Sequence, residues 1–126
     1  MACSDVDGDF AAPLLLIDAT DSTLDDPILS ILQPPNASGV FTGRFEGDTV
    51  TFTGQCNPAG QQTMISFTRT HPDGVTSTTY RARVIAVPAR QKVFMRGRFV
   101  RTMPNAAANP AALATLAGDW ETEKPT

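Results

Sequence analysis

Hydroxyl-bearing side chains stand near the ends of the strands that this sequence predicts, around a series of aromatic residues. The hydroxyls belong to Ser22, Thr76, Ser77 and Thr78, and the rings to Phe45, Phe67, Tyr80 and Phe99. In the mouth of a small β-barrel such residues can bind one ligand, because the rings pack its apolar body and the hydroxyls fix its polar end. Since these types are also common in cores and strands, a packed interior is the alternative.

Catalytic chemistry has little support in the sequence. His71, the single histidine, lies beside a proline in a predicted turn, which does not suit a Ser/His/Asp site. The sequence has no glycine-rich phosphate loop, no His/Cys cluster with metal-ligand spacing and no pair of carboxylates inside a predicted pocket. We therefore expect a protein that is not an enzyme and that holds no cofactor or metal.

The 126 residues suffice for one domain with its own core. No apolar run reaches the roughly 18 residues that span a bilayer, and the first ten residues lack the cationic and apolar regions of a signal peptide. We expect a soluble protein without a membrane partner, and a secreted protein whose leader preceded Met1 stays an alternative. Cys3 and Cys56 could form one bridge, but their spacing matches no motif and favours free thiols.

The net charge of −3 is distributed unevenly along the chain. Residues 1–30 contain seven aspartates and no lysine or arginine, whereas residues 81–101 contain seven basic side chains and no acid. The basic stretch could attract an anionic partner, but the acidic stretch offers it partners within the same domain, which we favour. Nucleic-acid binding is not expected, because the chain is acidic overall and few exposed aromatics interleave with the arginines.

The elements that must position these side chains are clearest in residues 39–54. Two alternating runs, GVFTGRF and TVTFTG, flank a short polar stretch. Pairing Glu46 with Thr49 across a two-residue loop gives a hairpin with one buried and one exposed face. The predicted buried face carries Phe41, Gly43, Phe45, Val50 and Phe52.

Further strands are expected on both sides of this hairpin. They are expected at residues 13–17 (a buried first strand), 27–32, 63–68, 75–87, 91–102 and 119–123. A helix is the alternative at 27–32, but the length and β-branched content favour a strand. Turns or loops are expected at 19–22, 34–38, 55–62, 71–74, 88–90 and 105–110, with a helical turn at 111–117.

A meander of this length must protect its edge strands, and closure into a barrel removes the edges altogether. We therefore predict an all-β fold, an antiparallel up-and-down meander closed into a small barrel of about eight strands. The domain would span residues 13–126 and would follow a flexible acidic N-terminus at residues 1–12.

The order of these elements resembles the avidin and streptavidin family of calycin-type barrels. The segments that carry the resemblance are GVFTGRF, ISFTRT, TSTTYRARV, GRFVRT and ANPAALATLAGDWETEKP. It extends from about Asp18 to Pro125 and is best between Phe67 and Tyr80, where the family has two tryptophans with a Ser-x-Thr pair between them. It implies a non-enzymatic binder of biotin or another cyclic amide, assembled as a dimer or tetramer.

The resemblance also implies the ligand-binding residues. By position, Asp18, Ser22 and Phe45 would surround a ureido oxygen, Thr76 and Thr78 would face the thioether and carboxylate, Phe67 and Phe99 would form walls, and Asp119 would bind a ureido nitrogen. Phe45 lacks the hydroxyl that the family has there, and Ala112 replaces an aromatic lid. A buried oxygen left without its donor costs about 1–3 kcal/mol, so weak binding is expected.

An interaction module is the alternative function. In that case the barrel is a packed scaffold, and an outer face with Arg81, Arg83, Arg96 and Arg98 meets an acidic partner or another subunit.

Overall fold

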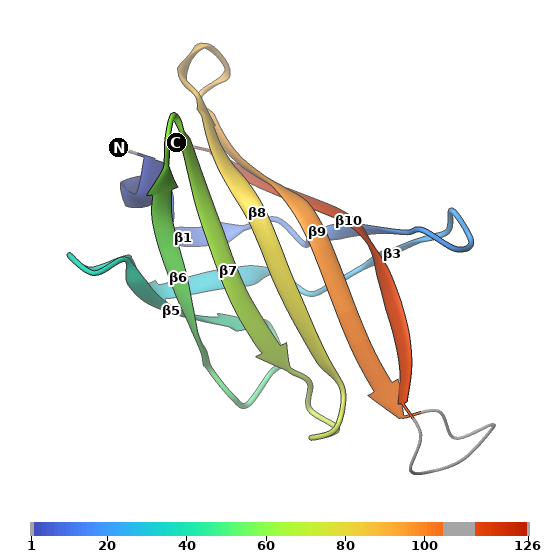
Figure 1. Ribbon diagram of the computed structural model, residues 1–126. Helices are drawn as coiled ribbons and strands as arrows, with labels where there is room; N and C mark the ends of the chain where they lie inside the picture. Colours follow the sequence, from blue (N-terminus) through green and yellow to red (C-terminus); the bar gives the residue numbers. More distant parts are fainter. Residues whose placement is uncertain (1, 105–112, 126) are drawn as a thin grey trace.

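The computed structural model describes residues 2–104 and 113–125, and in these ranges the protein is all-β, as predicted. Ten strands form one antiparallel sheet there (Figure 1). They are β1 (Gly8–Phe10), β2 (Leu14–Ile17), β3 (Thr23–Asp25), β4 (Leu29–Gln33), β5 (Val40–Phe45), β6 (Phe52–Ala59), β7 (Gln62–Thr70), β8 (Ser77–Val87), β9 (Lys92–Pro104) and β10 (Leu113–Pro125). Two short 3-10 helices, η1 (Ala2–Asp5) and η2 (Pro88–Arg90), accompany them.

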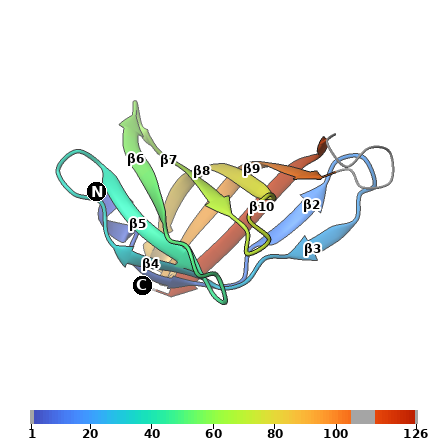
Figure 2. The ribbon, with the colours of Figure 1, turned by 90° about the horizontal axis from the view of Figure 1, so that it is seen from below.

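The sheet curls into a half-barrel (Figure 2). Near one end of the sheet β1 pairs with β4, and near the other end β2 pairs with β10, so the chain from β1 to β2 connects the two ends. Its order is β1-β4-β5-β6-β7-β8-β9-β10-β2-β3. The β1–β4 and β2–β3 ladders share one register, and a bond from Asp26 N–H to Pro13 O continues it between them. β1 and β2 therefore act as two halves of one longer strand, and so do β3 and β4. With each of these pairs counted as one strand, the sheet has eight strands, in agreement with the predicted small barrel. No helix in the described ranges is long and apolar enough to cross a membrane.

The hairpin of β5 and β6 has the predicted register but a wider turn. Gly43 lies opposite Phe52, as predicted, and the ladder ends at this pair. Val50, which was expected on the buried face, is 54% exposed. The carboxylate of Asp48 explains the difference, because it is buried and hydrogen-bonded to Arg69 and draws the loop toward the end of the barrel.

Some other local predictions are wrong. Residues 55–62 are not a loop, because β6 and β7 extend into them and leave a tight turn at Gly60, where φ is 65°. The described part of the predicted helical turn, residues 113–117, is strand, because the ladder between β9 and β10 continues through it. The first strand is buried on one face only, since Leu14 and Leu16 are 41% and 40% exposed.

The predicted loop at residues 105–110 and Ala112 lie outside the described residues. The other turns are as expected. Gly74 N–H donates to His71 O in the β7–β8 turn, and η2 forms the turn between β8 and β9. The alternation predicted for β7, β8 and β9 is confirmed by their burial patterns.

Inward-facing aromatic side chains fill the middle of the barrel. The ring centroids of Phe67 and Tyr80 lie 4.9 Å apart, and those of Phe45 and Tyr80 lie 5.5 Å apart, both in stacked geometry. Trp120 meets Tyr80 edge-on at 5.1 Å. Such pairs add about 0.5–1.5 kcal/mol each to the gain from burial. The space between these strands is therefore occupied by side chains.

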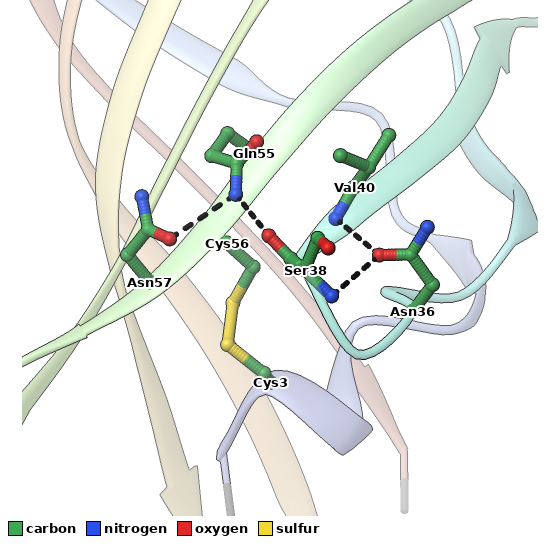
Figure 3. The surroundings of a disulfide bond; sticks show 7 residues. All are labelled: Cys3, Asn36, Ser38, Val40, Gln55, Cys56 and Asn57. Atoms are coloured by element: carbon green, nitrogen blue, oxygen red, sulfur yellow. Dashed lines mark hydrogen bonds between the residues drawn. A yellow bond between two sulfur atoms is a disulfide. The ribbon is translucent and has the colours of Figure 1, made fainter.

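The N-terminal residues belong to the same core. Val6 and Phe10 are fully buried and β1 pairs with β4, so the structure has no domain boundary at residue 12. Cys3 and Cys56 form a disulfide, and the expectation of free thiols is wrong (Figure 3). η1 brings Cys3 beside β6, a contact between distant segments that residue spacing does not reveal.

We expect the Cys3→Ser/Cys56→Ser double variant to be less stable than the wild type. The bridge spans 53 residues, and the chain-entropy model assigns a loop of this size a stabilisation of roughly 4 kcal/mol. Urea unfolding followed by the fluorescence of Trp120 measures the loss. The wild type under reducing conditions is the control and should match the variant. An unchanged unfolding midpoint would contradict this prediction.

Candidate functional site

The residues that the sequence predicts for a ligand site lie in separate places. Phe45, Phe67 and Phe99 are core residues. Thr76 precedes β8 and Thr78 lies near its start, whereas Asp18, Ser22 and Asp119 are exposed. The structure brings Phe45 and Phe67 together, with ring centroids 6.2 Å apart. It also brings Asp18 and Asp119 together, through Arg98 on the outer face. The whole set does not surround one cavity.

The hydroxyls predicted to hold a ligand are bound within the protein. Thr76 Oγ1 donates to Asp73 Oδ2 at 2.5 Å, and the hydrogen bonds from Thr76 and Val75 lower the pKa of Asp73 to about 2. Thr78 Oγ1 accepts a bond of 2.7 Å from Arg101 Nε. The β7–β8 turn therefore uses these threonines for its own structure.

Four buried charged side chains close this end of the barrel: Asp26, Asp48, Arg69 and Arg101. We call them the ion network. Arg69 Nε and Nη2 donate to the two carboxylate oxygens of Asp48 at 2.8 and 2.9 Å. Arg101 Nη2 donates to Asp26 at 2.7 and 2.9 Å, and Arg69 Nη1 reaches Asp26 Oδ1 at 3.4 Å. Two negative and two positive charges thus balance each other away from water.

Neutral groups complete the ion network. The Tyr80 hydroxyl donates to Asp26, and burial together with the charge of Asp26 raises the pKa of Tyr80 far above its usual value. His71 Nε2 lies 2.8 Å from Thr78 Oγ1. Burial, and then the charge of Arg69, lowers the pKa of His71, so this ring is neutral at pH 7. No buried side-chain polar atom of the described residues lacks a hydrogen-bond partner.

The ion network has the properties of a structural element. A general base needs a lone pair that can reach a substrate, and here both carboxylates accept bonds from guanidinium groups in a buried position. The sequence pattern could have indicated that the two arginines of the ion network face inward. Arg69 follows Phe67 and Arg101 follows Phe99 at the inward-facing spacing of two. Asp48 belongs to no periodic strand, so no pattern indicated its burial.

A groove of about 1130 Å³ lies on the outer face of β8, β9, β10 and β2, and we call it the outer groove. Its charged lining is Arg81, Arg83, Arg96, Arg98, Asp119 and Glu121, and its apolar lining includes Leu14, Leu16 and Val100. Val100 is 46% exposed, which leaves apolar surface beside the charges. Close approach of the strands under this face depends on Gly97, where an added Cβ would lie 1.9 Å from Arg81 O.

The arginines of the outer groove face one another across the ladder. Arg81 lies opposite Arg98, and Arg83 lies opposite Arg96. Like charges directly opposite each other destabilise a sheet. The β9 arginines have acidic partners, since Arg98 binds Asp119 at 2.9 Å and Arg96 binds Glu121 at 3.2 Å.

The β8 arginines differ from those of β9. Arg81 and Arg83 make no ion pair with any described residue. The hydrogen bond from Arg98 also lowers the pKa of Asp18, so this acid too is engaged by β9. The outer groove therefore presents two arginines of β8 whose guanidinium groups can take carboxylate partners from outside.

Comparison with known proteins gives no relative, since no family model, no curated protein and no solved structure matches this chain. The geometry above is therefore the basis for assigning a function. Its described residues include the ion network, whose polar groups are all bound, and the outer groove, where two arginines have no acidic partner among them.

We expect Asp26→Asn to destabilise the protein by about 3–5 kcal/mol, because it leaves the buried Arg101 without a counter-charge. Asp25→Asn is the matched control, since Asp25 is an exposed neighbour in β3 and its loss should change the stability little. Urea unfolding of both variants measures the difference. Equal midpoints for the two variants would show that the ion network contributes no net stability.

His71 should make stability depend on pH. Its folded pKa lies below the ordinary value of 6.5, so on acidification the unfolded chain binds a proton first. Stability is therefore retained above pH 6.5 and falls as the pH is lowered from 6.5 toward 5. His71→Gln, which keeps a hydrogen-bonding group for Thr78, should show a smaller decrease in urea midpoint over this range. The same decrease in both proteins would contradict the assignment.

Proposed function

We propose that this protein is a non-enzymatic binding module whose outer groove binds an acidic segment of a partner protein. The observation that carries the proposal is the facing pair of arginine columns on β8 and β9. Asp119 and Glu121 compensate the β9 column only. Carboxylates from a partner would relieve the repulsion by binding Arg81 and Arg83, and bidentate carboxylate binding suits arginine.

The rest of the groove favours a protein segment over a nucleic acid. Leu14, Leu16 and Val100 present apolar surface beside the charges, which suits a segment that carries both apolar and acidic side chains. Asp119 and Glu121 line the same groove and would repel a continuous phosphate backbone.

The biotin-type ligand implied by the avidin resemblance is the weaker proposal. A ligand among Phe45, Phe67 and Phe99 would have to displace Tyr80 and Trp120, which fill the space between these strands. Its polar end would also have to compete for hydroxyl groups that already bind protein partners. A homo-oligomer through the outer face stays a prediction, and the experiment below includes it.

We expect a fluorescent peptide that alternates glutamate with leucine to bind the protein, as measured by anisotropy. The Arg81→Ser/Arg83→Ser variant should bind it roughly tenfold more weakly, which corresponds to two exposed ion pairs lost. The control is Arg44→Ser/Arg90→Ser, which removes two exposed arginines that do not line the outer groove. Added salt should weaken binding to the wild type.

Equal loss of affinity in both variants, or no binding of the peptide, would overturn the proposal. Light scattering of the protein alone tests the other occupant. A dimer that Arg81→Ser/Arg83→Ser dissociates would assign the outer groove to a second copy of the chain. Heat released on titration with biotin, unchanged by the arginine substitutions, would assign binding to the barrel interior.

A further inference from the structure

The two ends of the barrel are sealed in different ways. The ion network closes the end that carries the β5–β6 and β7–β8 connections. Toward the other end, at the β6–β7 and β8–β9 turns, most inward-facing side chains are apolar, and the buried hydroxyl of Thr122 donates to Ala11 O. The apolar side chains are Cys56, Ile65, Val84, Val93 and Met95, and all of them are buried. Residues 2–7 lie at this apolar end.

η1 lies across the apolar end. It contacts both β6 and β8, which are not neighbours in the sheet because β7 lies between them. Cys56, the attachment point on β6, has the inward-facing parity of Phe52 and is 1% exposed. Val6, which follows η1, is fully buried in the core. The segment therefore enters the mouth of the barrel, beside the end of β6 that turns into β7 (Figure 1).

The disulfide is the covalent attachment of this segment. Its backbone bonds include two that are local, from Val6 N–H to Cys3 O and from Asp7 N–H to Asp5 O. The Lys124 ammonium donates to Asp7 O at 2.6 Å, and ladder pairing with the barrel begins at Gly8. Six residues kept in one conformation cost considerable chain entropy, and the bridge offsets that cost by keeping the segment close to its site.

We propose that residues 2–7 form a plug that the Cys3–Cys56 disulfide holds in the barrel, and that reduction by a dithiol opens an internal site for an uncharged apolar ligand. The ligand class follows from the buried side chains at this end, most of which are apolar. This site is independent of the outer groove, since it lies inside the barrel.

Reduction would proceed by thiol–disulfide exchange at the more accessible sulfur. Cys3 is partly buried whereas Cys56 is almost fully buried, so a thiolate of the dithiol attacks Cys3 Sγ. This forms a mixed disulfide and releases Cys56 as a thiolate, which takes up a proton. The second thiol of the reductant then displaces Cys3, which is protonated in turn. Two electrons and two protons pass to the protein, and the reductant leaves as a cyclic disulfide.

The experiment compares the oxidised and the reduced protein with Nile red, an uncharged apolar dye. We expect dye fluorescence to rise at least about tenfold after reduction with dithiothreitol, because the dye enters an apolar site. Hydrogen exchange should accelerate in residues 2–7, while the amides of β7, β8 and β9 keep their protection and near-UV circular dichroism is retained. Cys3→Ser/Cys56→Ser should bind the dye without reductant.

A second variant tests the plug with the bridge intact. Val6→Ser should raise dye binding in the oxidised protein, whereas Val75→Ser should not, because Val75 is exposed at the opposite end. The proposal is overturned if residues 2–7 stay protected after reduction, or if they are released and no dye binds. Loss of the whole tertiary structure on reduction would also overturn it, since the bridge would then hold the entire fold together.

Discussion

Four buried charges at one end of the barrel constrain the rest of this structure. Removing a charged side chain from water costs several kcal/mol, so such groups persist in a core only when they neutralise one another. Asp26 and Asp48 come from connections between strands, and Arg69 and Arg101 come from β7 and β9. The network therefore fixes where these distant segments meet.

The two ends, the middle and the outer face of the barrel differ in the side chains that they contain. The charged end and the aromatic middle are filled, and their polar atoms are bound within the protein. The apolar end is covered by η1 and its disulfide. The arginines of β8 remain on the outside, opposite those of β9, without an acidic partner among the described residues. This distribution is the basis of the proposal that the outer face binds a partner.

The sequence predicts the meander because alternation and turn chemistry are local. Phe67 and Tyr80 face inward as expected, and the same parity applies to Arg69 and Arg101. Local sequence patterns cannot predict contacts between distant segments. Asp48 meets Arg69 across 21 residues, and Cys3 meets Cys56 across 53. The site inferred by resemblance includes Asp119, which faces outward because Trp120 beside it faces inward. Ser22, another residue of that set, instead hydrogen-bonds to Thr20 in its own turn.

Two arginines are buried at one end of the barrel, while two others on its outer face are exposed to solvent. Hydrogen exchange of the arginine Nε–H groups, followed by ¹⁵N NMR, measures this directly. Arg69 and Arg101 should exchange slowly, because their Nε–H groups donate to Asp48 and Thr78 in buried positions. Arg81 and Arg83 should exchange at the rate of free arginine. Equal rates for all four would contradict the burial of the ion network, because the end of the barrel would then be open to water.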